Sequence, residues 1–343
     1  MAVPLVSIVL PTYRRPHYLR EALASAVGQT YKDIQIIVRD NASGDDTPTV
    51  VASFRDSRIE FFQARETGTA SENSRHCREH VRGKYLVHLC DDDLLGSQYV
   101  EVLVGFVESD PSILAAYGAT QLIDANGAVL GARVPDGTYT ARASEILRAW
   151  CAGTLPLATG INYLCPTSFI LGLGDRRHFA GGHNSDNAIF MAAGIHGKVL
   201  FTDRCLFYYR LHNSNSVHGH SCAVRAQGDL ALLAFIDRHV NAATNTGLPQ
   251  GEWYTDLRAR LQRMFAGDYY QHLRRVRPPA ASVRSILTDT TIRPLRAYGT
   301  RTTMRLLRAN ARLLALELLK RGPAPLHRLA KRVVRVAAQT FRQ

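Results

Sequence analysis

The stretch Tyr85-Leu86-Val87-His88-Leu89-Cys90-Asp91-Asp92-Asp93 joins an apolar run directly to three adjacent carboxylates. The run Tyr85–Leu89 is predicted to be a strand buried on both faces. Neighbouring carboxylates repel one another, so a folded chain keeps them beside a cation or in open solvent. At the end of a buried strand a cation is the simpler explanation, and oxygen ligands favour Mn²⁺ or Mg²⁺. A solvated acidic turn is the alternative for this stretch alone.

Similar apolar runs occur before and after this stretch, and segments with helical spacing separate them. The predicted strands, in addition to Tyr85–Leu89, are Leu5–Leu10, Ile34–Val38, Arg58–Phe62 and Ile113–Tyr117. The predicted helices between them are Tyr18–Val27, Asp46–Phe54, Ser71–Val81 and Gln98–Val107. Strands joined by crossover helices indicate an α/β fold with a mostly parallel open sheet flanked by helices. Further along, Asn126-Gly127 predicts a hairpin.

Polar clusters follow three of the predicted strands. They are Thr12-Tyr13-Arg14, Asp40-Asn41 and Asp91–Asp93. Because ligands of open parallel sheets bind beyond the carboxyl ends of the strands, these clusters are expected to meet at one edge and form a binding site.

Each of the first two clusters has a binding interpretation and a structural one. The backbone at Pro11 and Thr12 can border a nucleotide, and Arg14 can bind a phosphate. The structural alternative is an ordinary turn before a helix. Asp40 can accept hydrogen bonds from a base or a ribose. The alternative there is turn chemistry in Asn41–Gly44.

Two later segments also carry candidate functional groups. Asp186 precedes a predicted helix and can act as a general base, or it can cap that helix. Arg210 and His212 end a predicted strand and should point the same way, toward a diphosphate or a metal ion. The alternative is that both are surface residues.

Several common functional classes lack their signatures. The six cysteines include no CxxC pair, and HExxH, GxSxG and a glycine-rich phosphate loop are missing. The run Val3–Leu10 is too short for a signal peptide, and no run approaches the roughly 20 apolar residues of a membrane span. A cytoplasmic protein is expected.

Six segments, taken in order, resemble the family-2 group of inverting glycosyltransferases, which have the GT-A fold. The segments are Val6–Arg14, Ile37–Thr47, Gly68–Asn73, Leu89–Leu95, Ser185–Asn187 and Tyr209–His212. Each is weakly specific alone, whereas six in the correct order are highly specific. The resemblance covers about residues 3–215 and implies a GT-A sheet.

The resemblance also implies roles for individual residues. Asp40 looks like the nucleobase-binding aspartate, and Asp91 and Asp93 look like the ends of a metal-binding DXD motif. If the DXD motif is aligned one residue differently, Cys90 occupies a position where some members have aspartate, and Asp93 stays at the centre of the motif. Asp186 is similar to the catalytic base, although Ser185 stands where members often have glutamate. The implied nucleotide-sugar site comprises Pro11, Thr12, Tyr13, Arg14, Asp40, Asn73, Asp91, Asp92 and Arg210, and the implied metal ligands are Asp91, Asp93 and His212.

The implied reaction is a single displacement with inversion at the anomeric carbon. A sugar would move from a nucleoside-diphosphate sugar to a hydroxyl of a saccharide or lipid-linked acceptor, in cell-surface polysaccharide or glycolipid synthesis. The metal would stabilise the departing diphosphate, and Asp186 would take the acceptor proton. The alternative is a nucleotide-sugar-binding protein of the same fold that transfers nothing, which only the missing glutamate before Asp186 favours.

The net charge of +13 comes from the C-terminal part of the chain. Residues 271–343 contain 17 Lys or Arg and two acidic residues, whereas residues 1–270 are nearly neutral. Two basic amphipathic helices are predicted there, around Gly322-Pro323-Ala324-Pro325. They suit the inner, anionic face of a membrane or packing on the protein itself. Nucleic-acid binding is disfavoured, because few aromatics lie among the arginines.

The expected organisation has three parts. Residues 1–220 form the catalytic GT-A domain, residues 221–277 form a helical segment packed on it, and residues 278–343 form the basic amphipathic helical tail. The sequence predicts no oligomeric state.

Overall fold

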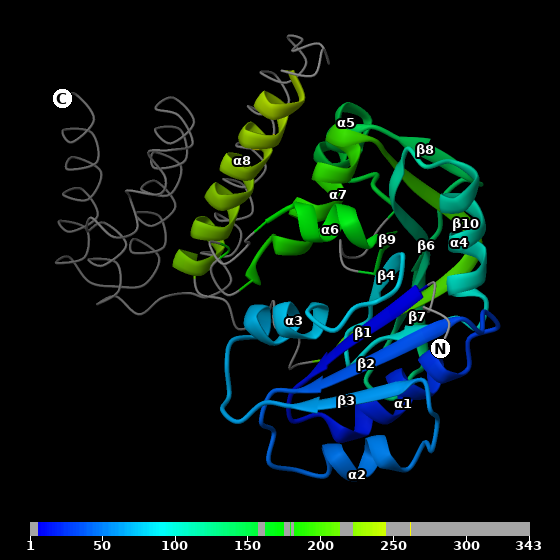
Figure 1. Cartoon of the computed structure of the whole chain (residues 1–343). Helices are drawn as coiled ribbons and strands as arrows, with labels where there is room; N and C mark the ends of the chain where they lie inside the picture. The colour runs from blue at the N-terminus through cyan, green and yellow to red at the C-terminus, as the bar shows by residue number, and fades with distance from the viewer. Residues whose placement is uncertain are drawn as a thin grey trace, which may run out of the picture.

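A computed structural model describes residues 6–156, 162–174, 179, 182–212, 222–244 and 261. The predicted alternation of strands and helices is confirmed in the first 120 residues (Figure 1). The strands are β1 (Val6–Thr12), β2 (Ile34–Asp40), β3 (Ile59–Gln63), β4 (Tyr85–His88), β5 (Leu94–Leu95), β6 (Ile113–Ile123), β7 (Val129–Arg133), β8 (Tyr139–Ala141), β9 (Leu164–Pro166) and β10 (Lys198–Arg210). The helices are α1 (Pro16–Val27), α2 (Thr47–Ala52), α3 (Ala70–Arg78), α4 (Tyr99–Ser109), α5 (Ala143–Ala152), α6 (Thr167–Gly172), α7 (Ser185–His196) and α8 (Cys222–Thr244).

The strands form one large open sheet in the order β3-β2-β1-β4-β9-β6-β10-β5. The first four strands of this order are parallel to one another, and β6 and β10 are also parallel. Short antiparallel strands complete the sheet: β9 lies between β4 and β6, and β5 pairs with the end of β10. The predicted α/β fold with an open sheet flanked by helices is therefore confirmed.

Alternating side chains of β1 explain why helices cover both faces of the sheet. Val6, Ile8 and Leu10 belong to one buried cluster with apolar residues of α1, α2 and α4. Val9 belongs to the other cluster, with residues of α3, α5, α7 and α8. A strand buried on both faces needs apolar residues throughout, as in this run.

The first strand was predicted to end at Leu10, before Pro11 and Thr12, and that end is wrong. Both residues continue β1, opposite Arg39 and Asp40 of β2. Proline is tolerated there because β4 ends opposite Val9, so no neighbouring strand needs the missing N–H group. As a result β1 and β2 extend together to the edge of the sheet, where Thr12 and Asp40 end them.

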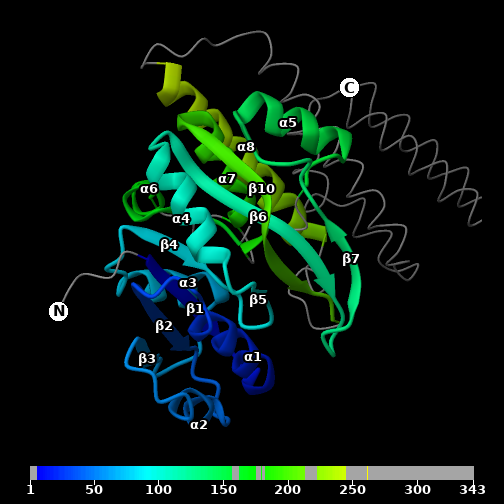
Figure 2. The same ribbon diagram turned by 90° about the vertical axis from the view of Figure 1, so that its right-hand side faces the viewer.

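The later part of the sheet was only partly predicted. The Asn126-Gly127 hairpin is confirmed: it joins β6 to β7, and the Asp124 N–H donates to the Ala128 carbonyl at 2.9 Å. Residues 198–210 form one long strand, β10, which pairs with β6 and has an irregularity between Phe201 and Leu206. Figure 2 shows β6 and β10 side by side with β7 at the outer edge. The three-residue strand β9 was not predicted.

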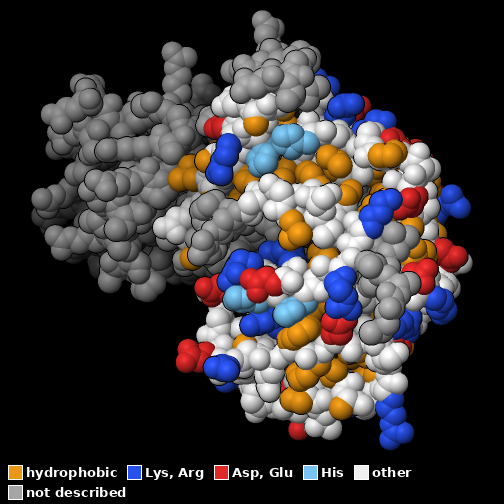
Figure 3. All heavy atoms as spheres, in the orientation of Figure 1, with side chains coloured by type: hydrophobic (Ala, Val, Ile, Leu, Met, Phe, Trp, Pro, Cys, Tyr) orange, Lys and Arg blue, Asp and Glu red, His pale blue; other side chains and the backbone are white. Residues whose placement is uncertain are grey.

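Helix α8 packs on the rest of the domain through Leu232, Phe235 and Ile236, which belong to the same buried cluster as α7. Apart from Leu261, residues 245–277 of the predicted helical segment and the basic tail 278–343 lie outside the described residues. Within the described part of the chain, no helix combines the length and apolar character needed to cross a membrane. Acidic and basic side chains are interspersed over the face of the domain in Figure 3, as its near-neutral charge leads one to expect.

Candidate functional site

Three aspartates form a buried cluster at the carboxyl end of β4. The chain leaves the strand after Leu89, whose N–H still donates to Val9, and turns so that the Asp93 N–H meets the Cys90 carbonyl at 3.3 Å. Asp91, Asp92 and Asp93 are 6%, 7% and 1% exposed. They are therefore not a solvated acidic turn, and their charges must be compensated inside the protein or by a cation.

Asp91 is held by groups at the end of β1. Its Oδ2 accepts hydrogen bonds from the Thr12 hydroxyl at 2.8 Å and the Tyr13 N–H at 3.2 Å. Its Oδ1 lies 3.2 Å from Nη1 of Arg15. Burial and the neighbouring Asp92 charge raise the pKa of Asp91 to about 6. This carboxylate thus links the acidic turn to the strand end where a nucleotide was expected.

Asp92 has two cationic or potentially cationic partners. Its Oδ2 is 2.6 Å from Nη1 of Arg15 and 2.9 Å from Nε2 of His212. The His212 ring stacks on Tyr18 of α1 at a centroid distance of 5.0 Å. His212 was predicted as a metal ligand, but here its ring reaches the cluster through Asp92.

Asp93 has one oxygen with no protein partner. Pairing of β5 with β10 brings Asp93 beside the end of β10, where its Oδ1 accepts the Arg210 N–H at 2.8 Å. Its buried Oδ2 has no hydrogen-bond partner among the residues that the structure describes. Burial, followed by the charge of Asp92, raises the pKa of Asp93 well above its usual value. A buried carboxylate oxygen that lacks a partner is unfavourable unless a ligand occupies it.

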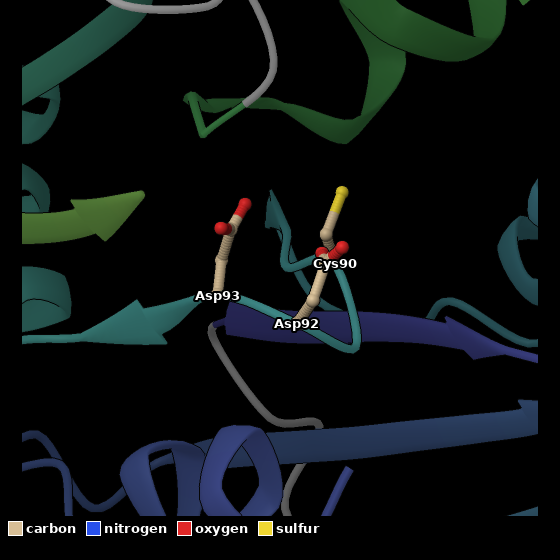
Figure 4. A group of neighbouring side chains, drawn as sticks. All are labelled: Cys90, Asp92 and Asp93. Atoms are coloured by element: carbon tan, nitrogen blue, oxygen red, sulfur yellow. The ribbon is translucent and has the colours of Figure 1, made fainter. Parts of the chain in front are cut away.

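Cys90 lies near the Asp93 carboxylate. Ligand atoms of Cys90, Asp92 and Asp93 all lie within 4.8 Å of one another, and Figure 4 shows the three side chains on the same side of the turn. The predicted metal ligands Asp91 and His212 do not belong to this group. The sequence indicated a role for Cys90 only in the alternative alignment of the DXD motif.

Arg210 is fully buried, and its guanidinium group is used within the protein. Its Nε donates to the Asp92 carbonyl at 2.8 Å, and its Nη2 pairs with Glu21 at 2.6 Å. It also lies over the Tyr18 ring, at 4.9 Å from the centroid. Arg210 and His212 do converge on one region, as the extended spacing predicted, but Arg210 contacts the backbone of the acidic turn.

Asp40 is fully buried at the end of β2. Its Oδ1 accepts from the Ser43 N–H at 3.1 Å and from the Ser43 hydroxyl, and its Oδ2 accepts from Gln63 at 3.0 Å. The Arg14 N–H donates to the Ser43 hydroxyl at 2.8 Å. Asp40 and the Arg14 backbone therefore share one hydrogen-bonded loop.

Asn73 joins the first two strands from helix α3. The helix begins at a capping box in which Thr69 and Glu72 bond to each other's backbone N–H groups. The Asn73 amide then donates to the carbonyls of Thr12 and Arg39, at 3.3 and 3.2 Å. The side chain thereby holds the ends of β1 and β2 together.

Asp186 lies half-buried in the first turn of α7, after the N-cap residue Asn184. Its charge reaches Tyr209 of β10, as do the charges of Asp93 and Asp92. Burial, then these acidic neighbours, raises the pKa of the Tyr209 phenol. The predicted base and the acidic turn therefore lie within electrostatic range of one tyrosine.

No sequence pattern predicted that Arg15, Glu21 and Tyr18 belong to the site. Arg15 follows directly after the quoted first segment, and only its three-dimensional contacts distinguish it from Arg14. Glu21 and Tyr18 lie on α1, on the turns that face Arg210. Their helical spacing is a signal, but the sequence does not show that β10 ends against α1.

Residues 7–143 match the sequence model of the Glycosyl transferase family 2. A glycosyltransferase of uncharacterised specificity from Rickettsia bellii is 33% identical over 165 residues, 47% of this chain and 23% of that protein. The UDP-Glc:alpha-D-GlcNAc-diphosphoundecaprenol beta-1,3-glucosyltransferase WfgD of Escherichia coli is 26% identical over 48% of this chain and 64% of its own length. The chain thus spans less than two thirds of these relatives.

Among solved structures, residues 1–349 of Staphylococcus aureus TarS share the fold with a TM-score of 0.59 and 14% identity. The likeness covers 98% of this chain and 89% of that one. The same TarS fragment is also known in complex with UDP-GlcNAc, with a TM-score of 0.55 and 12% identity to this chain. The family match, the relatives and the shared fold confirm the predicted resemblance: residues 7–143 match a family-2 glycosyltransferase domain, and the sheet is of the GT-A type.

Proposed function

We propose that the chain is an inverting glycosyltransferase that moves a sugar from a nucleoside-diphosphate sugar to a hydroxyl of a saccharide or lipid-linked acceptor. One observation carries the proposal: the family-2 domain ends its fourth strand in a buried acidic turn with an unpartnered carboxylate oxygen, Oδ2 of Asp93. A buried acidic group of this kind suits a cation and the diphosphate bound to it.

The residues of the acidic turn fit a divalent metal ion, Mn²⁺ or Mg²⁺. Asp93 through Oδ2, together with Asp92, would hold it. When bound, such an ion supplies Lewis-acid stabilisation of the charge on the departing diphosphate. Asp91, which both Thr12 and Arg15 engage, would keep the strand end and the acidic turn in a fixed relation.

His212 and Arg210 serve, in this proposal, to position the acidic turn. His212 hydrogen-bonds Asp92, as an outer-shell group orients a carboxylate ligand. Arg210 fixes the turn through the Asp92 carbonyl and the Asp93 side chain. A role of Arg210 in direct diphosphate binding is less consistent with its complete burial.

Asp186 is proposed as the general base. The acceptor oxygen attacks the anomeric carbon while the bond from that carbon to the diphosphate oxygen breaks, and the hydroxyl proton passes to the Asp186 carboxylate. Removal of the proton during attack contributes about 10²–10⁴ in rate in typical enzymes. A single displacement of this kind inverts the configuration at the anomeric carbon.

The nucleotide is proposed to lie across the ends of β1 and β2. Tyr13 is 37% exposed there and offers a ring surface and a backbone next to Asp91. Asp40 and Asn73 hold the loops on either side of Thr12 in place. Arg14 follows Tyr13 on the exposed side and can meet a phosphate.

The acceptor class rests on the relatives. WfgD and a Campylobacter jejuni protein are named for undecaprenol-linked saccharide substrates, and the latter is 34% identical over 30% of this chain and 34% of its own length. We propose a comparable acceptor in cell-surface polysaccharide or glycolipid synthesis.

The basic segment 278–343 would hold a cytoplasmic enzyme at the anionic inner face of the membrane. Deletion of 278–343 should then abolish flotation with anionic vesicles and leave donor binding unchanged, and unchanged flotation would contradict the membrane role.

A thermal-shift panel of nucleoside diphosphates and their sugars, with and without Mn²⁺, tests the function. At least one nucleotide should raise the melting temperature of the chain, and it should do so more strongly with Mn²⁺. Release of that nucleotide from its sugar donor should then be measured with acceptor present. A panel in which no nucleotide stabilises the chain would contradict the proposal.

A further inference from the structure

Cys90 is the one sulfur group in the acidic turn, and it lies on the side of the turn that carries the unpartnered oxygen. Its Sγ, one oxygen of Asp92 and one of Asp93 lie within 4.8 Å of one another. Figure 4 shows the thiol and the Asp93 carboxylate pointing the same way from the turn. Cys90 as a whole residue is half-buried.

From this geometry we infer that the metal site is a mixed sulfur and oxygen site, with Cys90 as a ligand beside Asp93 and Asp92. The inference rests on the proposed metal-dependent function and adds a ligand and a metal preference to it. An independent observation supports a cation there: within the described part of the chain, Oδ2 of Asp93 is buried, has no protein donor and belongs to a residue that is 1% exposed.

The distances are compatible with one shared ion after side-chain adjustment. Zinc-type ions bind sulfur at about 2.3 Å and carboxylate oxygen at about 2.0–2.2 Å, so two ligands at a tetrahedral angle on one ion are about 3.4–3.6 Å apart. The separations here are up to 4.8 Å. Side-chain shifts that shorten the longest of these separations by about 1 Å would therefore bring all three ligand atoms within bonding distance of one ion.

The surroundings favour Cys90 over Asp91 as the third ligand. Both oxygens of Asp91 already accept hydrogen bonds, from Thr12, Tyr13 and Arg15. Asp92 is oriented by Arg15 and His212, which leaves the Cys90 side of the turn for the ion. On binding, the thiol proton is released to solvent and the sulfur coordinates as thiolate.

A thiolate ligand changes which ion the site prefers. Mg²⁺ binds oxygen ligands almost exclusively, whereas Co²⁺ and Zn²⁺ accept sulfur readily, and Mn²⁺ lies between them in the order of affinities. The chain should therefore bind Co²⁺ and Zn²⁺ more tightly than Mn²⁺, and Mg²⁺ least tightly. Replacement of the Cys90 sulfur by oxygen, as in Cys90→Ser, should reduce the difference in affinity between Co²⁺ or Zn²⁺ and Mn²⁺ or Mg²⁺.

Titration of the metal-free full chain with Co²⁺ tests the inference. We expect a near-ultraviolet thiolate-to-cobalt absorption that saturates at one ion per chain. It should disappear in Cys90→Ser, with an affinity for Co²⁺ lower by at least about ten-fold. The matched control is Cys151→Ser, which removes another half-buried cysteine, in α5, and should keep the absorption.

A second measurement avoids any loss of folding in the variants. Co²⁺ should slow alkylation of Cys90 in the wild-type chain, with the modified site identified by peptide mass spectrometry. Calorimetric Co²⁺ binding without thiolate absorption or protection of Cys90 would overturn the role of Cys90 and leave the acidic metal site intact. Absence of Co²⁺ and Mn²⁺ binding, even with nucleotide present, would overturn both this inference and the proposed metal dependence.

Discussion

Replacement of Arg15 by glutamine should destabilise the protein more than any exposed arginine substitution on α1. Nη1 of Arg15 lies 2.6 Å from Asp92 and 3.2 Å from Asp91, and the arginine side chain is 25% exposed. Removing one partner of a buried ion pair costs about 3–5 kcal/mol, whereas a surface pair contributes about 0–1 kcal/mol. Partial exposure puts the expected cost between these limits, at about 2–3 kcal/mol.

Urea unfolding and thermal melting in metal-free buffer measure this cost. For a domain of this size, 2–3 kcal/mol corresponds to a fall in melting temperature of about 5–10 °C. The control is Arg20→Gln, because Arg20 is an exposed residue of α1 that donates to Ser53 at 3.3 Å. Mn²⁺ should reduce the cost of Arg15→Gln, since a divalent ion also compensates the aspartates. Equal stability of the two variants would refute the idea that Arg15 compensates buried charge.

Three further outcomes follow from the structure. Asp186→Asn should lower the rate of sugar transfer by about 10²–10⁴ and leave donor affinity unchanged, and the exposed control Asp203→Asn should change neither quantity. A loss of donor affinity in Asp186→Asn would contradict the assignment of Asp186 as the base. Asp40→Asn should weaken nucleotide binding by about ten-fold in calorimetry, with or without Mn²⁺, because the new amide N–H group would face the Ser43 N–H, which is also a donor. Unchanged nucleotide affinity would count against the Ser43 loop as part of the nucleotide site. Burial, then the nearby His196, lowers the pKa of His239 from 6.5 to about 4. The contribution of neutral His239 to stability should therefore be complete above pH 6.5 and be lost as the pH drops toward 4. His239→Gln should flatten the pH dependence of the unfolding free energy in this range, and an unchanged pH dependence would refute this assignment.

The parts of the fold that the sequence predicted are those with strong local signals. Apolar runs of five or six residues predicted β1, β2 and β4, and polar residues at their ends predicted the edge where the site lies. The hairpin at Asn126-Gly127 also has a local turn signal. These features depend on neighbouring residues, so sequence spacing is sufficient to find them.

The parts that were missed depend on pairing between distant segments. The strands β5 and β9 are two and three residues long, and only their partners β10, β4 and β6 make them strands. In the candidate site, too, the deciding contacts join residues that are far apart in the sequence. The predicted metal ligands were chosen by spacing along the motif, whereas contacts with β1, α1 and β10 decide which carboxylate oxygen lacks a partner.

Arg210 shows most clearly what sequence alone leaves out. Its spacing from His212 predicted that both side chains point the same way, and in the structure both contact Asp92 of the acidic turn. The sequence did not show that Glu21, the Asp92 carbonyl and the carbonyls of Asp124 and Ala125 surround the guanidinium group. Its donors are therefore used for holding the turn, and the proposed role changed accordingly.

The central claim is that the acidic turn binds a divalent ion and, through it, the nucleoside diphosphate. Isothermal titration of the full chain with the nucleotide that stabilises it, with and without Mn²⁺, measures this coupling directly. Wild-type protein should bind that nucleotide at least ten-fold more tightly with Mn²⁺, and Asp93→Asn, which keeps an acceptor for the Arg210 N–H, should lose that gain. Equal Mn²⁺ enhancement in wild type and Asp93→Asn would contradict the account.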